Sequence, residues 1–454
     1  METKKRPFFD AGFFHDMLPL AVPIALQNLL MCSFRLVDTL MVGQLGDTSI
    51  AAVGLAGQMS FFIELVVFGF ASGASVFIAQ YHGAGNRDGI LRAFGATALF
   101  SVPVGLLAAC AGFFFPDLVL RLFTDDASLV LEGAKYMRYA CFSYLGLTLY
   151  QPMAITLRST EQVRIPMVTS ILAAAVNAGL NYVFIFGKLG LPAMGVAGAG
   201  LASAISGLVN PLLILAISVK RRNILIAPLK KLFALKGFLG LYFSRVLPVL
   251  ANEGFWSLSV LGLNMVYGRM GADNYAALTV FRTIENIVFV FFVGICNACN
   301  ILVGKRIGAG EFEEGKRYAV RFMALVPIMS VVLGAALILS RGAILSLFDV
   351  SETARATAMG LMLLYSIMLS FINVPYLGVV GVFRAGGDTR FGLYMDVFVQ
   401  YLLLLPAAYI CGLVLKLPFL TTYAIGVGIE AATKCVIVLT HFARMRWIRP
   451  VTAE

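Results

Sequence analysis

Long runs of apolar residues, separated by short polar or glycine-containing breaks, follow one another along most of this chain. A helix of about 20 mostly apolar residues spans the roughly 30 Å hydrocarbon core of a bilayer. The runs are rich in Gly and Ala and lack the in-out alternation of barrel strands, which excludes a β-barrel. The pattern predicts twelve transmembrane helices, over residues 17–42, 50–79, 93–115, 130–157, 165–187, 196–219, 237–267, 275–303, 318–340, 354–383, 391–413 and 420–443.

The second half of the chain repeats the first half. Matched residues include Pro23 and Pro248, Gly46 and Gly271, both pairs 225 positions apart, and, after a slip of one residue, Arg158 and Arg384. A repeat this long in an apolar chain is typical of transporters built from two homologous bundles, whose substrate sites lie at the repeat interface. We therefore expect an N-lobe over residues 14–219 and a C-lobe over residues 237–448, each with six helices, joined by a basic linker over residues 220–236.

Charge and composition indicate the location and orientation of the chain. Hydrophobic residues make up 60% and charged residues 13%, and the mean hydropathy of +0.88 is that of a membrane protein. The net charge of +11 comes largely from Lys and Arg near both termini, in the 220–236 linker and after the eighth expected helix. With an even number of helices these segments face one side, as the positive-inside rule requires of the cytoplasm. We expect a multi-pass protein of the cell (inner) membrane with both termini cytoplasmic, in contact with lipid and not with nucleic acid.

Motifs of catalytic chemistry are missing from the sequence. It contains no Walker motif and no HExxH, and its three histidines, His15, His82 and His441, fall near helix ends. Cys296 and Cys299 form a CxxC inside an apolar run, but no His or second Cys pair accompanies them, so packing is the better interpretation. Repeated filter sequences and rings of pore charges, typical of channels, are also missing. We predict that the protein is not an enzyme and needs no cofactor, and that an ion gradient supplies its energy.

Ionisable residues inside the expected spans are the first candidates for function, because each costs about 2.5–3.5 kcal/mol or more at the bilayer centre. These residues are Arg35, Asp38, Glu64, Glu253, Arg282, Glu285, Asp396, Glu430 and Lys434. Some are spaced three or four residues apart, so that they share a helix face and can neutralise one another: Arg35 with Asp38, Arg282 with Glu285, and Glu430 with Lys434. For Glu285 and Glu430 the spacing leaves a structural ion pair and a transport role open.

Two of the remaining acids differ in their surroundings. Asp396 lies near the end of its expected helix, where an interfacial position is inexpensive, and we expect a structural role. Glu64 falls in the middle of its span without a cation at helical spacing, and we consider it a candidate for substrate binding or coupling.

Asp38 is accompanied by neutral oxygen donors. Asn177 and Asn181 are four residues apart and lie on one face of the fifth expected helix, and Ser203 adds a hydroxyl from the sixth. A carboxylate, two amides and a hydroxyl are the hard donors that coordinate Na⁺ or hold a protonatable acid in a hydrogen-bonded pocket. If these helices meet, the four residues form a cation site.

Several motifs along nearly the whole chain carry a resemblance to a known family. They are Pro23, Asp38-Thr39-Leu40-Met41-Val42-Gly43, Gly46, Ala51-Ala52, the stretch 177–187, Leu191-Pro192, the stretch 195–203, Asn252-Glu253-Gly254-Phe255-Trp256, the stretch 267–271 and Arg384-Ala385-Gly386-Gly387-Asp388-Thr389. The chain resembles a bacterial multidrug and toxic compound extrusion (MATE) transporter. The resemblance implies an all-α membrane protein whose twelve transmembrane helices form two homologous six-helix lobes around a central cavity.

The resemblance also implies roles for individual residues. Asp38, Asn177 and Ser203 match the family's N-lobe cation site, whereas Asn181 stands where many members have Asp. One carboxylate then balances one monovalent cation, and the coupling ion stays open between Na⁺ and H⁺. Glu253 matches the family's acid on the seventh helix.

The expected function is therefore secondary active efflux, in which Na⁺ or H⁺ is exchanged for an organic, cationic drug or toxic compound by alternating access. We expect a monomer in which substrate binding and coupling involve Glu64, Glu253, Trp256, Arg282 and Glu285. The aromatic ring of Trp256 offers cation–π contact. The alternative is a lipid-linked oligosaccharide flippase of the same superfamily, which the helix count and the Asp38–Asn177 pattern disfavour.

The repeat is not symmetric at these residues. Asp38 falls opposite Leu263, and Glu253 falls opposite Asn28. The scaffold was duplicated and its polar chemistry was not, so we expect one lobe to hold the ion while the other supplies an acid of its own.

Overall fold

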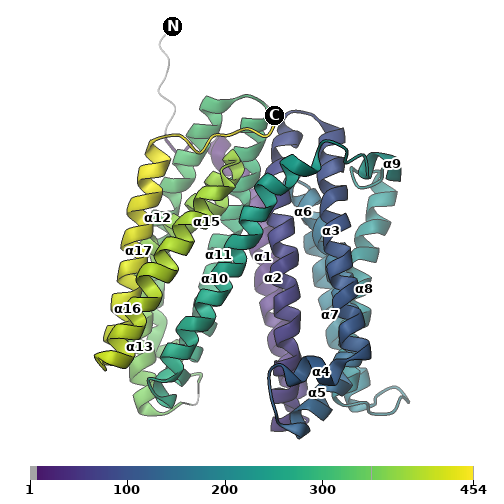
Figure 1. Cartoon of the computed structure of the whole chain (residues 1–454), viewed down its shortest axis with the longest axis vertical. Coiled ribbons are helices and arrows are strands. Elements are labelled where there is room, and N and C mark those ends of the chain that lie inside the picture. Colours follow the sequence, from purple (N-terminus) through teal and green to yellow (C-terminus); the bar gives the residue numbers. More distant parts are fainter. Residues whose placement is uncertain (1–7, 349, 453–454) are drawn as a thin grey trace. The chain divides into compact units, whose positions relative to one another are not determined.

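The computed structural model describes residues 8–348 and 350–452, which form helices and no strands (Figure 1). The first half of the chain contains α1 (Ala11–Gly43), α2 (Asp47–Gly83), α3 (Arg87–Phe114), α4 (Pro116–Arg121), α5 (Ala127–Ala140), α6 (Phe142–Ser159), α7 (Arg164–Phe186), α8 (Val196–Arg221) and α9 (Leu229–Leu232). The second half contains α10 (Leu239–Gly268), α11 (Ala272–Gly308), α12 (Phe312–Leu345), α13 (Glu352–Tyr376), η1 (Leu377–Phe383), α14 (Arg384–Gly386), α15 (Thr389–Val397), η2 (Phe398–Leu404), α16 (Leu405–Tyr409), η3 (Ile410–Val414) and α17 (Phe419–Ala443). The expected all-α fold is confirmed.

The chain folds into two compact units. The N-unit comprises Leu26–Val246, and the C-unit comprises Leu247–Glu454 together with Met1–Ala25. The division falls inside α1 and α10 and not in the 220–236 linker, at which the sequence pattern divides the lobes. The first turns of α1 therefore belong with the second half of the chain, and the first turns of α10 belong with the first half.

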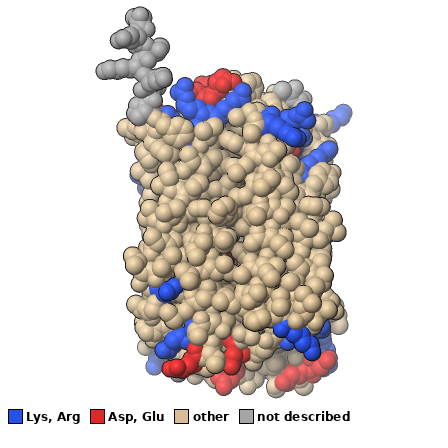
Figure 2. Space-filling model, turned by 90° about the vertical axis from the view of Figure 1, so that its left-hand side faces the viewer, with Lys and Arg blue, Asp and Glu red and all other residues tan. Residues whose placement is uncertain are grey.

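Eleven helices among the described residues are long and apolar enough to cross a membrane. The expected helix over residues 130–157 is the exception, because it is divided into α5 and α6. Cys141 joins the two with a backbone that is still right-handed helical, and its N–H donates to the Met137 carbonyl at 3.0 Å. The helical path therefore continues through the division. Figure 2 shows one face of the molecule on which charged side chains gather at two ends and an almost uncharged band lies between them.

The repeat is visible in the local geometry of equivalent helices. α2 and α11 each have 37 residues and follow the glycines Gly46 and Gly271. These glycines have φ of 106° and 119°, a region that residues with a Cβ rarely adopt. The repeated glycines of the sequence thus fix the turn that precedes the longest helix of each half.

Small residues bring α8 close to its neighbours in the N-unit. A Cβ added to Gly198 would lie 2.6 Å from the Phe184 carbonyl of α7, and one added to Gly200 would lie 2.4 Å from the Tyr136 carbonyl of α5. Backbones approach this closely only where side chains are absent. The run of small residues over 195–200 therefore determines how α8 sits against α5 and against α7, the helix that carries Asn177 and Asn181.

The helices of the C-unit are less regular. In the described ranges, the π-helical segments η1, η2 and η3 lie in the two paths that run from α13 to α14 and from α15 to residue 414. The equivalent helices of the N-unit, α6 and α7, carry no such segment in the described residues. Short π-helical segments are frequent at functional sites, and η1 and η2 here flank Arg384 and Asp396.

Candidate functional site

The structure brings Asp38, Asn177 and Asn181 together in the N-unit. The Asn181 side-chain amide of α7 donates to Asp38 Oδ1 of α1, and it also donates to Asn177 Oδ1 at 3.2 Å. Asn181 is fully buried, and Asp38 and Asn177 are half-buried. The buried Oδ1 of Asn181 has no hydrogen-bond partner among the described residues. The cluster therefore offers a carboxylate and an unused amide oxygen at one place.

The hydroxyl that contacts the asparagines comes from Ser206 and not from Ser203. Asn177 Nδ2 donates to Ser206 Oγ at 3.2 Å, and Ser206 in turn donates to the backbone carbonyl of Ser203 at 3.2 Å. The Ser203 side chain instead interacts with the hydroxyl of Tyr136, which also lies within the electrostatic influence of Asp38. Ser206 and Tyr136 were not predicted from the sequence pattern, although Ser206 lies one helical turn after Ser203.

Arg35 does not pair with Asp38 as the spacing suggested. Its guanidinium lies 3.3 Å from Glu64 Oε1 and 3.4 Å from Oε2, across from α1 to α2. Glu64 thus has a cation partner on another helix. Asp38 accepts a hydrogen bond from the neutral amide of Asn181, and within the described residues no arginine contacts its carboxylate.

A second polar network in the N-unit surrounds Arg158. The Arg158 guanidinium donates to Gln27 Oε1 at 3.0 Å, and Gln27 Nε2 donates to the hydroxyls of Tyr150 and Ser170 at 2.9 Å each. Gln27, Tyr150 and Ser170 are buried. The network connects α1, α6 and α7 through one charged side chain and neutral partners, which suits a structural junction.

Glu253 in the C-unit is already paired. Its Oε1 lies 2.7 Å from the guanidinium of Arg384, and the side chains are 16% and 3% exposed. Arg384 also reaches Asn252 Oδ1 at 3.5 Å. A cationic substrate would have to compete with a buried arginine for Glu253, so this acid is a weaker anchor than its sequence position suggests.

Asp396 belongs to a buried ionic cluster. The Lys434 ammonium lies 2.7 Å from Asp396 Oδ1 and 2.9 Å from Glu430 Oε1, which joins α15 to α17. The expected Glu430–Lys434 pair is therefore present. Asp396, which we expected near the membrane interface, is only 13% exposed and shares the ammonium with Glu430.

Neutral side chains hold both carboxylates of this cluster. Asn252 Nδ2 donates to Asp396 Oδ2 at 2.7 Å, and Gln400 Nε2 donates to Glu430 Oε1 at 2.8 Å. Gln400 is fixed in turn by a hydrogen bond of 2.8 Å from the fully buried Ser259. These residues and Lys434 form a continuous hydrogen-bonded path from α10 to α17.

Arg282 and Glu285 lie near this cluster without an ion pair between them in the described residues. Arg282 donates to Asn264 Oδ1 at 2.5 Å. Glu285 interacts electrostatically with Arg282 and Glu430, and it lies close to Tyr365 and Tyr423. Trp256, the remaining expected substrate residue, is 43% exposed on α10.

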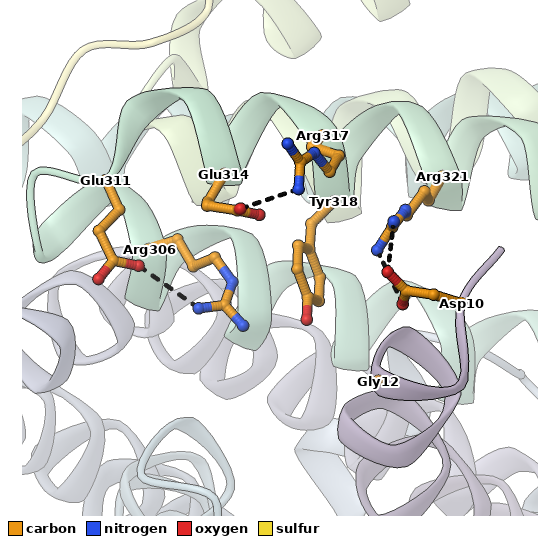
Figure 3. Close-up of a pocket in the computed structure, with 8 residues that line it drawn as sticks. All are labelled: Asp10, Gly12, Arg306, Glu311, Glu314, Arg317, Tyr318 and Arg321. Carbon is orange, nitrogen blue, oxygen red and sulfur yellow. Dashed lines mark hydrogen bonds and ion pairs between the residues drawn. The ribbon is translucent and has the colours of Figure 1, made fainter. Parts of the chain in front are cut away.

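A cavity of about 300 Å³ lies elsewhere in the C-unit, where the start of α1 meets α11 and α12. In Figure 3, Arg321 points at Asp10, Arg317 at Glu314 and Arg306 at Glu311. The lining residues are Asp10, Gly12, Arg306, Glu311, Glu314, Arg317, Tyr318 and Arg321. None of the residues expected to bind cation or substrate lines this cavity, so we do not regard it as the transport site.

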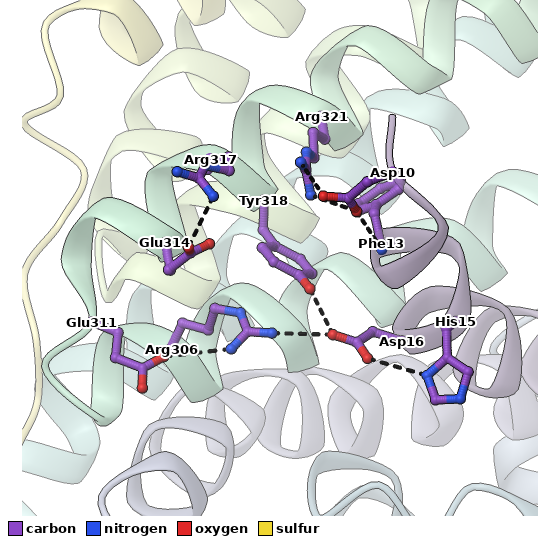
Figure 4. A network of polar contacts seen from close by, with 10 residues as sticks. All are labelled: Asp10, Phe13, His15, Asp16, Arg306, Glu311, Glu314, Arg317, Tyr318 and Arg321. Atoms are coloured by element: carbon purple, nitrogen blue, oxygen red, sulfur yellow. Dashed lines mark hydrogen bonds and ion pairs between the residues drawn. The ribbon is translucent and has the colours of Figure 1, made fainter. Parts of the chain in front are cut away.

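The charged groups around this cavity hold α1 in place. Arg321, which is 5% exposed, donates to both carboxylate oxygens of Asp10 at 3.2 and 2.8 Å, and Asp10 also caps α1 by accepting from Phe13 N. Figure 4 shows Arg306 and Tyr318 converging on Asp16, at 3.1 and 2.6 Å. The paired charges explain why the first turns of α1 belong to the C-unit.

A family model described as MatE matches residues 23–183 and 248–410, one segment in each half of the repeat. Curated proteins of known name also align with most of the chain. The chain is 26% identical over 456 residues to "Probable multidrug resistance protein YoeA" of Bacillus subtilis. This alignment covers 97% of this chain and 96% of that protein. The chain is also 26% identical over 405 residues to "Probable multidrug resistance protein NorM" of Pasteurella multocida. This alignment covers 87% of this chain and 85% of that protein.

Solved structures share the fold. A protein described as MATE, crystallised in complex with MaL6, superposes with a TM-score of 0.84 at 20% identity, which covers 97% of this chain and 99% of that chain. At this identity the likeness extends to the helical architecture and not to the identity of a ligand.

Proposed function

The chain belongs to the MatE family, because the matched segments cover more than half of it, and we propose that it exchanges Na⁺ or H⁺ for an organic, cationic compound across the membrane. Members of this family are transporters and not enzymes. The named relatives are multidrug resistance proteins, which supports the export of drugs or other toxic compounds. We further propose that the protein acts as a monomer in the cell (inner) membrane, with both termini in the cytoplasm.

The observation that supports cation coupling best is the Asp38 cluster. One carboxylate is held by the Asn181 amide, and a buried amide oxygen of the same asparagine has no partner among the described residues. A buried oxygen without a partner is stabilised when it accepts a hydrogen bond or coordinates a cation. A single negative charge balances a single monovalent cation, so the cluster is suited to Na⁺ or to one proton.

In the proposed mechanism Asp38 alternates between an ion-bound and an ion-free state. Ion and substrate bind preferentially to opposite conformations, so that each promotes release of the other. The amide of Asn181 keeps the carboxylate oriented, because it donates to Asp38 and also to Asn177, which in turn donates to Ser206.

The proposal is tested by reconstituting the full chain in liposomes and imposing a Na⁺ or H⁺ gradient while following a fluorescent cationic dye. We expect gradient-driven dye movement by the unchanged protein and its loss in Asp38→Asn, which keeps the shape of the side chain and removes its charge. Asp47→Asn, an exposed acid in the first turn of α2, is the matched control and should transport normally.

Three outcomes would contradict the proposal. Unaltered transport by Asp38→Asn would remove Asp38 from the coupling step. Ion flux without dye movement would indicate a channel. Movement of a lipid-linked oligosaccharide in place of the dye would favour the flippase alternative.

A further inference from the structure

The two halves of the repeat carry unequal charge at equivalent positions. In the register of the repeat, Gln27 corresponds to Asn252, Arg158 to Arg384 and Ser170 to Asp396. Both arginines reach the equivalent amide, at 3.0 Å in the N-unit and 3.5 Å in the C-unit. The N-unit forms this junction with neutral partners, so the additional charges of the C-unit are not needed to hold the helices together. Charges at membrane depth are expensive and are retained for function.

The additional charges converge on a single ammonium. Lys434 Nζ lies between Asp396 and Glu430, at 2.7 and 2.9 Å, and the three side chains are 12%, 13% and 29% exposed. Asn252 and Gln400 hold the two carboxylates independently of Lys434. Each carboxylate therefore has a hydrogen-bond partner besides the lysine that lies between them.

The charge of this region is not balanced. The carboxylates are those of Glu253, Glu285, Asp396 and Glu430, and the cationic side chains are those of Arg282, Arg384 and Lys434. The carboxylates of Asp396 and Glu430 share the single ammonium of Lys434, so these three ionised groups carry a net charge of −1. Arg384 already pairs with Glu253, so the unbalanced charge belongs to the part that contains Lys434. One further monovalent cation would neutralise it.

Aromatic rings lie near Glu430 in this cluster. Tyr267 and Tyr423 are close enough to Glu430 to interact with it electrostatically, and their ring centroids are 5.8 Å apart. Aromatic faces attract organic cations more than they attract strongly hydrated inorganic ions. Glu430 is the more exposed of the two carboxylates, so a competing cation reaches it first.

We propose that Lys434 is an internal cation that occupies the Asp396–Glu430 site and competes with the positively charged group of the transported compound. The substrate cation displaces the ammonium from Glu430, while Lys434 keeps its ion pair with Asp396. The inference rests on the proposed function, since it assigns the export substrate its charge partner. The competition lowers the affinity for the substrate, because binding must replace an existing ion pair, and it favours release once the ammonium returns.

Equilibrium binding of ethidium to the purified full chain in detergent tests this competition without any ion gradient. We expect Lys434→Gln to tighten binding by about tenfold or more, a change of about 1.4 kcal/mol, because two oriented carboxylates are left without their internal cation. Lys434→Arg should stay near the affinity of the unchanged protein. Lys416→Gln, an exposed lysine of the same unit, removes one positive charge elsewhere and should have no effect.

A second variant covers the case in which Lys434→Gln does not fold. Glu430→Gln leaves Lys434 paired with Asp396 and removes the unbalanced charge, so it should weaken ethidium binding by about tenfold. Unchanged or weaker binding by a folded Lys434→Gln, or unchanged binding by Glu430→Gln, overturns the inference.

The inference and the proposed function fail in different ways. If the unchanged protein moves dye under an ion gradient and these variants bind ethidium as it does, only the role of Lys434 is wrong. If the unchanged protein binds ethidium and Lys434→Gln tightens binding, but no gradient drives dye movement, the coupling proposal is wrong and the binding site stands. An unchanged protein that binds no organic cation overturns both.

Discussion

The network around Arg158 in the N-unit and the network around Arg384 in the C-unit occupy equivalent places in the repeat but differ in charge. Arg158 contacts the neutral side chains of Gln27 and Tyr150. Arg384 contacts the amide of Asn252 and, in addition, the carboxylate of Glu253. The arginine and its amide partner are thus the shared scaffold, and the acids are the part that distinguishes the C-unit.

The N-unit has its acid in another place. Asp38 lies on α1 beside the amides of Asn177 and Asn181, and the position opposite Asp38 in the repeat is Leu263. Each unit therefore has one polar region that the other lacks: a neutral-amide pocket with a single carboxylate in the N-unit, and a lysine-centred ionic cluster in the C-unit. Under the proposed function, we expect the two halves to have separate tasks on a common framework.

Replacing each of the two arginines should give the largest difference in stability between the equivalent networks. Arg384→Gln leaves Glu253 buried without its ion pair, and we expect a loss of about 3–5 kcal/mol in the free energy of unfolding. Arg158→Gln removes hydrogen bonds to neutral groups and should lose about 1–3 kcal/mol. Thermal unfolding of the purified protein in detergent measures both. Equal losses would mean that the Glu253 pair contributes nothing beyond the shared junction.

The packing of α8 provides a sharper comparison of backbone geometry. Gly200→Ala places a Cβ 2.4 Å from the Tyr136 carbonyl, and we expect a loss of about 1–3 kcal/mol in stability. Gly428, which follows 228 positions later in α17, has nothing within 4 Å of an added Cβ, so Gly428→Ala should be neutral or stabilise the helix by up to about 1 kcal/mol.

The same two variants test whether the packing of α8 also supports ion binding. Displacement of α8 in Gly200→Ala should also weaken gradient-driven transport, because Ser206 on α8 supports Asn177. Similar thermal transitions and transport rates in the two glycine variants would contradict the importance of this close contact.

The pair of Arg35 and Glu64 should show the smallest effect. Their side chains are 70% and 42% exposed, and ion pairs at this exposure contribute less than about 1 kcal/mol. Arg35→Gln should therefore leave the thermal transition almost unchanged. A tenfold fall in transport with unchanged stability would give this pair a direct part in coupling, as the position of Glu64 in its span suggested.

The sequence predicts the scaffold well, because the determinants are local or repeated. The runs of apolar residues predict the eleven described helices that are long and apolar enough to span a membrane. The family that the sequence resembles is also confirmed. Gly46 and Gly271 predict where α2 and α11 begin, because each fixes a backbone conformation that other residues avoid. The division at Cys141 has no equally clear signal in the sequence.

The partners of the polar residues are less predictable, because they depend on how helices distant in sequence are rotated against one another. Helical spacing correctly predicts Glu430 with Lys434 and the shared face of Asn177 and Asn181, which are contacts within one helix. It cannot predict that Asp396, 38 positions before Lys434, completes the cluster.

Packing between helices also explains why two contacts in the N-unit differ from those expected from the sequence. Arg35 reaches Glu64 on α2 and not the nearby Asp38. Ser206 takes the place expected of Ser203 because the rotation of α8 is set by its close contacts with α5 and α7. Both outcomes depend on packing between helices, which spacing along one helix does not encode.

The division of tasks between the units is tested most directly by measuring ethidium affinity and gradient-driven dye transport on two variants side by side. We predict that Asp38→Asn loses coupled transport while its equilibrium affinity for ethidium is unchanged. We also predict that Lys434→Gln binds ethidium about tenfold more tightly while its transport keeps its dependence on ion concentration. If either variant alters affinity and ion dependence together to the same degree, the two polar regions form one site and the division is contradicted.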